Sequence, residues 1–374
     1  MKKIRILQFP IANSYGGITH YALDNWYKMD KSKFECDFAT MSPQIDFSEE
    51  IEKTGAKIFY LSCYPSKDKE LFKKEFNAIL DNGYDVVHLH TKQWKDFTVE
   101  EICKERGIKK VIVHSHSTRC DNNDDEERRK ETDIHNRVKA EFTEDLATDF
   151  WACSQMAADW LFGPQISRDK IKIMHNAIEI EKFLFNPDIR RKKRRELGFN
   201  DDDFIIGNVG RLCYQKNQEL LVNAFAKAFE VNENVKLVLV GEGPHLNTLK
   251  NLVSKLDIED RVLFLGKRYD VNELYQAFDL FALTSRFEGL PITLIEAQCS
   301  GLLCLVNSTI TKESEISEKI RWVENCKEEW INSLQKYSYV QERNNMTEQM
   351  RKSGYDINEQ VSIVSLNYES EYEI

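Results

Sequence analysis

The sequence lacks the marks of a membrane-spanning protein, a disulfide-stabilised protein or a nucleic-acid binder. No stretch of the 374 residues approaches the roughly 20 consecutive apolar residues that a membrane-spanning helix needs. The nine cysteines include no Cys-x-x-Cys pair, and an odd number of thiols fits a reducing cytosol. With 62 acidic and 52 basic residues the net charge is −10, which argues against a general nucleic-acid binder. We therefore expect a cytoplasmic protein whose only membrane contact is with a surface.

A secretory signal and a complete dinucleotide-binding fingerprint are also missing. The apolar run that follows the basic residues 2–3 is interrupted by Arg5 and Gln8, and no small-residue cleavage site follows it. We interpret residues 4–9 as a first strand instead. Residues 241–244 (Gly-Glu-Gly-Pro) form a strand-to-helix turn, but they do not complete a Gly-x-Gly-x-x-Gly pattern. An NAD-dependent oxidoreductase is therefore disfavoured.

Strand-like and helix-like segments alternate along the chain, which predicts parallel sheets covered by helices. The series begins at residues 4–9 and restarts at Phe204–Val209. A chain of 374 residues is long enough for two domains, each with its own core. The expected fold class is therefore α/β with two units.

One stretch combines a strand, a glycine loop and a helix. The apolar run Leu280–Leu283 predicts a buried strand, the loop 284–289 follows, and Pro291 suits the first position of a helix that stops at Gly301. A helix start offers unpaired backbone N–H groups and the positive end of a dipole, which favours an anion such as a diphosphate. The candidate diphosphate-binding residues are Gly289, Leu290, Pro291 and Ile292.

Two carboxylates flank this helix start. Glu288 lies in the loop, and Glu296 lies inside the helix between Ile295 and Ala297. A carboxylate beside an apolar stripe usually only reaches solvent. Two glutamates around one helix start favour a binding role over that interpretation.

A second loop carries two cations. Gly210-Arg211-Leu212 follows the strand Phe204–Val209, and Lys216 comes five positions after the arginine. A guanidinium and an ammonium on one loop can neutralise a diphosphate and the charge that gathers on it as it leaves. The alternative is an ordinary surface loop.

Glu288 and Glu296, separated by seven residues in EGLPITLIE, resemble the paired-glutamate signature of retaining nucleotide-sugar glycosyltransferases with the GT-B fold. From residue 1 to about residue 316 the chain resembles bacterial capsule and exopolysaccharide glycosyltransferases. The resemblance implies two Rossmann-like, doubly wound domains that face each other across a cleft. Residues 1–183 would bind the acceptor, residues 184–345 would bind the nucleotide-sugar donor, and residues 346–374 would cross back to the first domain.

The resemblance also implies roles for individual residues. Arg211 and Lys216 would grip the diphosphate, Glu288 would bind sugar hydroxyls and Glu296 the ribose hydroxyls. No metal or other cofactor is expected, because the cations replace a metal. The candidate catalytic residues are Glu288, Arg211, Lys216 and His116, and further donor contacts are expected from Gly16, Gly17, Gly241 and Arg268. The glycine pair in Asn13-Ser14-Tyr15-Gly16-Gly17 also suits an ordinary tight turn.

Two His-x-His pairs, His88/His90 and His114/His116, end predicted strands. Alternate residues share one face of a strand, so each pair has the geometry of one edge of a metal site. No cysteine or carboxylate spacing completes a tetrahedral set, and the resembled family needs no protein-bound zinc, so we predict no metal. His116 matches the family's histidine near the transferred sugar, and His90 is a weaker candidate.

Two charged stretches each allow two interpretations. Residues 119–149, which contain DNNDDEERRKE, predict a solvated loop or helix face, and the alternative is a mobile segment that contacts the acceptor. The basic run 190–195 predicts the solvated first helix of the second domain, and the alternative is a contact with anionic lipid.

The resulting functional hypothesis is a hexosyltransferase. It would move a sugar from a nucleotide donor, a uridine diphosphate sugar by analogy, to a polyprenyl-diphosphate-linked saccharide in capsule, exopolysaccharide or O-antigen synthesis, with no nucleic-acid partner. The alternatives are a GT-B nucleotide-sugar epimerase, which would release free nucleotide from donor alone, and a non-catalytic sugar-nucleotide-binding partner of another transferase. The combination of Glu288, Glu296, Arg211 and Lys216 disfavours the non-catalytic alternative.

Overall fold

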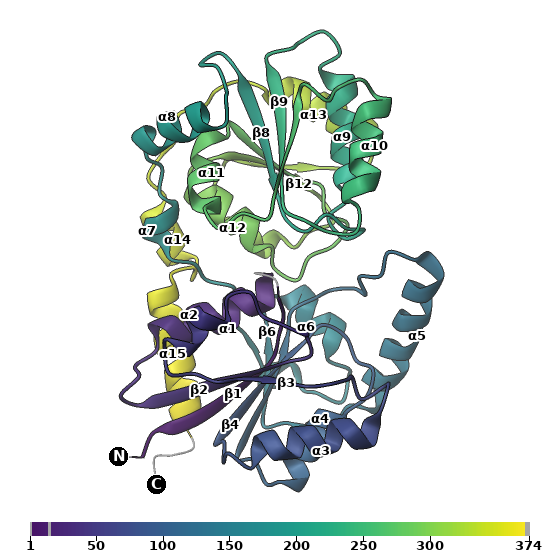
Figure 1. Cartoon of the computed structure of the whole chain (residues 1–374), viewed down its shortest axis with the longest axis vertical. Coiled ribbons are helices and arrows are strands. Elements are labelled where there is room, and N and C mark those ends of the chain that lie inside the picture. The colour runs from purple at the N-terminus through teal and green to yellow at the C-terminus, as the bar shows by residue number, and fades with distance from the viewer. Residues whose placement is uncertain (1, 14–15, 371–374) are drawn as a thin grey trace. The chain divides into compact units, whose positions relative to one another are not determined.

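The computed structural model describes residues 2–13 and 16–370 and contains two units, each built on one parallel sheet (Figure 1). The first unit continues to Cys120, resumes over Asp124–Ala177 and takes up the chain again from Asp356. The second unit comprises Asp121–Asn123 and Ile178–Tyr355. The prediction of an α/β protein with two Rossmann-like units is confirmed.

The first unit has a seven-stranded sheet in the order β3-β2-β1-β4-β5-β6-β7, with every neighbouring pair parallel. The strand order reverses between β1 and β4, and such sheets bind ligands at this switch point, at the carboxyl ends of their strands. The strands are β1 (Ile4–Ile11), β2 (Phe34–Thr40), β3 (Ile58–Tyr60), β4 (Val86–Thr91), β5 (Lys110–Ser115), β6 (Asp149–Ala152) and β7 (Ile171–Ile173).

Helices cover both faces of this sheet. Tyr368 and Val364 of the last helix are fully buried against the same core as Trp26 of the first. Asn25 Nδ2 donates to Gln360 Oε1 at 3.2 Å, which joins the two helices through a buried hydrogen bond. The helices are α1 (Gly17–Lys28), α2 (Ser48–Glu52), α3 (Lys69–Leu80), α4 (Thr98–Glu105), α5 (Asp125–Glu141), α6 (Gln155–Leu161) and α15 (Ile357–Glu369).

The second unit has a six-stranded parallel sheet in the order β10-β9-β8-β11-β12-β13. Helices α9, α10 and α13 pack on one face, and α11 and α12 pack on the other (Figure 1). The strands are β8 (Phe204–Val209), β9 (Val235–Val240), β10 (Val262–Gly266), β11 (Leu280–Leu283), β12 (Leu303–Asn307) and β13 (Ile320–Val323). The helices are α7 (Ile180–Phe183), α8 (Pro187–Glu196), α9 (Gln218–Ala228), α10 (Leu246–Lys255), α11 (Val271–Ala277), α12 (Ile292–Cys299), α13 (Lys327–Tyr337) and α14 (Thr347–Lys352).

The chain passes between the units at Ala177/Ile178 and at Tyr355/Asp356. The sequence placed these transitions at residues 183 and 345. Of the two helices in the predicted segment 346–374, α14 therefore belongs to the second unit and α15 belongs to the first.

The basic run does not form a uniformly solvated face. Arg190 and Arg194 both pair with Asp279, at 2.5 and 3.1 Å, and Lys193 lies 2.7 Å from Asp270. Half of the six basic side chains therefore attach α8 to its own unit, because buried cations need partners. This reduces the cationic surface available to lipid to Arg191, Lys192 and Arg195.

The acidic stretch forms the helix α5, which Asp124 caps by accepting from two backbone N–H groups. Only His135 and Val138 of this helix are buried. The prediction of a solvated helix face is confirmed. In the part of the chain that the structure describes, none of the helices combines the length and the apolar character that crossing a bilayer requires.

Candidate functional site

The centre of the candidate site is a buried ion pair between two loops of the second unit. Lys216 Nζ lies 2.6 Å from Glu288 Oε1, and the side chains are only 15% and 7% exposed. Gln215 Nε2 donates to Glu288 Oε2 at 3.2 Å and to the carbonyl of Phe287 at 3.0 Å. The loops meet because they follow β8 and β11, which are neighbours in the parallel sheet.

The same two loops are joined along their backbones. The Thr284 hydroxyl donates to the carbonyl of Lys216 at 3.1 Å, and the Arg286 N–H donates to the carbonyl of Gln215 at 2.8 Å. Asn217 then turns the chain into α9 with a left-handed backbone, φ 53°. Hydrogen bonds to the carbonyls of Gln215 and Lys216 therefore fix the loop from which the Lys216 side chain extends.

Glycines bring a third loop against this group. The Lys216 stem crosses Gly210, where an added Cβ would lie 3.2 Å from Lys216 Cε. A Cβ on Gly241 would lie 2.1 Å from the carbonyl oxygen of Gly210, so only glycine fits there. The close approach of the Gly210 backbone is enough to explain why residue 241 is a glycine. The predicted contact of Gly241 with the nucleotide stays a prediction.

Arg211 lies on the same loop as Lys216. Its guanidinium pairs with the carboxylate of Asp121, and Asn123 Oδ1 accepts from the N–H of Tyr214 at 3.1 Å. Residues 121–123 thus group with the second unit although the chain on both sides of them belongs to the first. Arg211 is 52% exposed, which leaves part of its guanidinium surface open to solvent.

Glu296 does not reach solvent. It is 5% exposed on α12, and the Tyr275 hydroxyl donates to its Oε2 at 2.8 Å. Burial, followed by the charge of Glu296, raises the pKa of Tyr275 well above its usual value, so the phenol remains a donor. The interpretation of Glu296 as a solvated carboxylate is therefore wrong.

The helix after the loop begins one residue later than the sequence suggested. Pro291 is its N-cap, and the carbonyl of Pro291 accepts from Leu294 and Ile295 at 3.0 and 3.3 Å. Pro291 is thus outside the helix, although the expected strand, loop, helix and left-handed Gly301 (φ 72°) are all present.

Three polar side chains near this helix start were missed by the sequence reasoning. Gln215 holds Glu288 in place, as described above. The hydroxyl oxygens of Ser285 and Thr293 are buried and have no hydrogen-bond partner among the described residues. Buried hydroxyls without partners are costly, so these two are candidates for contact with a ligand. A hydroxyl two positions into the helix was the available signal for Thr293.

Arg268 forms ion pairs in another part of the second unit. Its guanidinium lies 2.6 Å from Asp270 and 3.5 Å from Glu196 of α8. The hydrogen bond from Arg268, followed by the one from Lys193, lowers the pKa of Asp270. The structure joins Arg268 to α8 rather than to the Lys216–Glu288 pair, and its contact with a base stays a prediction.

In the first unit, Gly16 and Gly17 begin α1 after β1. Gly16 has an extended backbone (φ −85°, ψ 170°), and its carbonyl accepts from His20 at 3.0 Å. Neither glycine is required here by a left-handed backbone. Ser14 and Tyr15 of the same predicted loop lie outside the described residues.

All four histidines of the two His-x-His pairs come together at β4 and β5. His88 Nε2 contacts His114 Nδ1 at 3.2 Å, and His90 Nδ1 contacts His116 Nε2 at 3.0 Å. The Tyr21 ring of α1 lies edge-on to all four imidazoles. Burial lowers the pKa of each histidine, that of His90 to about 3, so the imidazoles are neutral near neutral pH.

Three comparisons place these observations among known proteins. A family model described as "Glycosyl transferases group 1" matches residues 189–356. The putative glycosyltransferase EpsF of Bacillus subtilis is 30% identical over 313 residues, which cover 83% of this chain and 80% of that protein. The Escherichia coli UDP-Gal:alpha-D-GlcNAc-diphosphoundecaprenol alpha-1,3-galactosyltransferase is 35% identical over 144 residues, or 37% of each chain.

Among solved structures, HepE of Anabaena in complex with UDP and glucose superposes with a TM-score of 0.76 over 100% of both chains. The two sequences are 19% identical, so this likeness supports the fold alone.

Proposed function

The chain belongs to the group 1 glycosyltransferases, and on this premise we propose that it transfers a sugar from a uridine diphosphate sugar to a lipid-linked saccharide with retention of anomeric configuration. It is an enzyme of the glycosyltransferase class with the GT-B fold. The donor, the acceptor, the stereochemistry and the role of each residue belong to the proposal.

The observation that supports the donor site best is the Lys216–Glu288 pair beside the start of α12. The ammonium is mostly buried and paired with Glu288, the Thr284 hydroxyl holds the Lys216 backbone, and Arg211 lies on the same loop. Two preorganised cations and a helix start suit a diphosphate, because they stabilise its charge without reorganising during the reaction. We propose that these groups bind the donor without a metal ion.

In the proposed reaction the acceptor oxygen bonds to the anomeric carbon while the bond from that carbon to the diphosphate oxygen breaks. The electron pair leaves with the nucleoside diphosphate, and the acceptor proton passes to the departing phosphate oxygen. Lys216 and Arg211 offset the charge that develops on this leaving group. Attack on the face that the diphosphate leaves gives retention without a protein nucleophile.

In this proposal, each of the two carboxylates accepts hydrogen bonds from a different set of donor hydroxyl groups. Glu288 accepts from hydroxyls of the transferred sugar, and its contact with Lys216 places it next to the diphosphate. Glu296, fixed by Tyr275, accepts from the ribose hydroxyls. In the first unit, Gly16 and Gly17 are the candidates for contact with the donor diphosphate, and His116 is the candidate for contact with the transferred sugar.

The relatives support the choice of donor and acceptor. The name of the E. coli relative specifies UDP-galactose, a diphosphoundecaprenol-linked acceptor and an α-1,3 product. HepE binds UDP and glucose. EpsF, which aligns with 83% of this chain, is named as a putative glycosyltransferase. We propose exopolysaccharide synthesis as the setting from the motif resemblance, with the acceptor presented at a membrane surface.

A donor screen tests the proposal. The full chain is heated with uridine, guanosine and thymidine diphosphate sugars, and the donor that raises the melting temperature is incubated with an undecaprenyl-diphosphate-linked saccharide. We expect a uridine diphosphate sugar to stabilise the protein and mass spectrometry to detect one added hexose on the lipid, equally well without added Mg²⁺ or Mn²⁺. NMR of the product then reports the anomeric configuration.

The alternatives give different results in the same assay. An epimerase would release free nucleotide from donor alone. A binding partner without activity would be stabilised by donor yet leave every lipid-linked acceptor unchanged. The absence of stabilisation by any sugar nucleotide at saturating concentration would contradict the donor site.

A further inference from the structure

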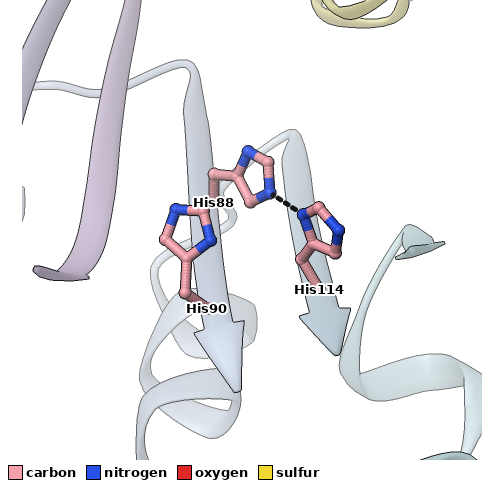
Figure 2. A group of neighbouring side chains, drawn as sticks. All are labelled: His88, His90 and His114. Carbon is pink, nitrogen blue, oxygen red and sulfur yellow. Dashed lines mark hydrogen bonds between the residues drawn. The ribbon is translucent and has the colours of Figure 1, made fainter. Parts of the chain in front are cut away.

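Three buried imidazoles to which the proposed transfer reaction gives no role converge in the first unit. His88, His90 and His114 are 0%, 3% and 0% exposed, and one ring nitrogen from each lies within 4.8 Å of the others (Figure 2). Figure 2 shows the rings of His88 and His114 meeting nitrogen to nitrogen across the gap between β4 and β5.

The sheet register explains this convergence. His90 of β4 pairs directly with His114 of β5, and His88 is two residues before His90. Residues two apart on a strand project from the same face, so all three imidazoles emerge on one side of two adjacent strands. The sequence argument against a metal looked for cysteines and carboxylates near each pair, and it had no access to this pairing of the two strands.

One pair of these nitrogens has the spacing of a coordination shell, and all three lie within 4.8 Å of one another. His88 Nε2 and His114 Nδ1 are 3.2 Å apart. A tetrahedral zinc ion with Zn–N distances of about 2.0–2.1 Å separates its nitrogen ligands by roughly 3.3–3.4 Å. His116 Nε2 lies 3.0 Å from His90 Nδ1, next to the third ligand.

Two of the three outer nitrogens have the partners that metal-binding histidines usually have, whereas His114 Nε2 is buried without a hydrogen-bond partner among the described residues. Tyr368 Oη of α15 lies 2.7 Å from His88 Nδ1, and Gln8 Oε1 of β1 lies 2.7 Å from His90 Nε2. An imidazole that donates its outer N–H to such an oxygen directs the lone pair of its other nitrogen inward, which is the usual arrangement around bound metals. Burial also keeps the rings neutral, the form that binds metal.

We propose that His88, His90 and His114 bind one transition-metal dication, Zn²⁺ by ligand chemistry. A set made only of imidazole nitrogens suits Zn²⁺ and its late transition-metal neighbours, whereas Mg²⁺ and Ca²⁺ require oxygen ligands. The ion cross-links β4 to β5 and, through Tyr368, positions α15 against the sheet. This site lies in the first unit and is separate from the metal-free diphosphate site proposed for the second.

Metal analysis of the full-length wild-type protein, produced without a histidine tag, tests the proposal. We expect about one equivalent of Zn²⁺ per chain, and after chelation and addition of Co²⁺ we expect the visible absorption bands of tetrahedral Co²⁺ coordination. Failure of the folded wild-type protein to retain Zn²⁺, or to give these bands with Co²⁺, would mean that the cluster is a metal-free chain of hydrogen-bonded imidazoles.

Variants assign the ligands. His88→Asn and His114→Asn should abolish the Co²⁺ bands, whereas His245→Asn, in the second unit, should leave them unchanged. Tyr368→Phe keeps the ring but removes the hydroxyl that orients His88, and it should weaken Zn²⁺ binding by about 10–100-fold. Unchanged Co²⁺ spectra in folded His88→Asn and His114→Asn proteins would overturn the assignment, and if those variants do not fold, unchanged affinity in Tyr368→Phe would do so.

Discussion

At the scale of single residues, the candidate site depends on a cation that the protein itself already neutralises. The carboxylate of Glu288 is 2.6 Å from the ammonium of Lys216, and both are mostly buried. A bound diphosphate would compete with this carboxylate for the same ammonium. The arrangement keeps Lys216 fixed and paired without ligand, which avoids the large cost of an isolated buried charge.

Replacing Lys216 with alanine tests whether its ammonium contributes to catalysis. We expect turnover to fall by on the order of 100-fold or more, because one preorganised charge that stabilises the leaving group is lost. Steady-state kinetics with saturating donor measures the effect, and Lys255→Ala on α10 serves as the exposed-lysine control. Near-normal turnover in Lys216→Ala would exclude the role.

A double variant controls for the carboxylate that Lys216→Ala leaves unpaired. If the unpaired Glu288 is the cause of any fall in melting temperature, Lys216→Ala combined with Glu288→Gln should recover that temperature, since a neutral amide costs less to bury. The double variant should still lack turnover. Recovered activity in the double variant would instead mean that Lys216 acts only by neutralising the carboxylate of Glu288.

The spacing of residues in the sequence predicted which residues belong to this site, but it did not predict which of them contact one another. Glu288 and Glu296 were predicted from one motif, and Lys216 from another. That Lys216 and Glu288 form one pair follows from the adjacency of β8 and β11, which no spacing in the sequence contains. Gln215 and Tyr275 were missed for the same reason, because each acts through a contact with a distant part of the chain.

At the scale of helices and strands, the second unit matched expectation wherever the apolar pattern was strong. Strands β8 and β11 have the predicted limits, and both are completely buried. Helix α13 was not predicted, because only Trp330 and Leu334 of its residues are buried and its apolar stripe is correspondingly narrow. Helix α8 was predicted, but the burial of Lys193 and Arg194 was not, since Asp270 and Asp279 are remote in sequence.

Helix α4 contains a carboxyl group that makes the stability of the protein depend on pH. Burial, with a smaller contribution from the charges of Asp96 and Glu101, raises the pKa of Glu100 to about 8. The usual pKa of a glutamate, which applies to the unfolded chain, is 4.5. Between these two values the folded protein binds more protons than the unfolded chain, so the free energy of unfolding decreases as pH rises.

Glu100→Gln should remove this dependence. We expect the variant to be more stable than wild type near pH 8, with the difference shrinking towards pH 5 by up to about 1.4 kcal/mol per pH unit. Urea unfolding across that range measures it. Glu105→Gln changes an exposed carboxylate of the same helix that does not act on Glu100, and it should leave the slope unchanged. Identical slopes for Glu100→Gln and wild type would contradict the raised pKa.

At the scale of the whole molecule, the first unit is completed by the end of the chain. Val364 and Tyr368 of α15 are fully buried in a core that also contains Trp26 and Phe34. A fragment that ends at Ala177 exposes this part of the core to water. Leaving a large buried side chain out of a packed core costs about 3–5 kcal/mol, which is comparable to the stability of many domains.

Residues 2–177 alone should therefore fail to fold, whereas the same fragment joined by a flexible linker to 356–370 should fold. Far-ultraviolet circular dichroism and cooperative urea unfolding distinguish the two proteins. The same linked protein with Val364→Asp and Tyr368→Asp in the α15 segment is the control, and it should not fold. Cooperative unfolding of residues 2–177 without the helix would show that α15 is dispensable.

The return of the chain to the first unit has a consequence for exchange between relatives. Apart from Asp121–Asn123, the second unit is one continuous piece, residues 178–355, inserted into a first unit whose sequence is split. Recombination can therefore replace the half that we propose to bind the donor as a single cassette with two junctions, at Ala177/Ile178 and Tyr355/Asp356. Replacing the other half requires two segments to be inherited together, so the acceptor side is expected to diversify by point substitution rather than by transplantation.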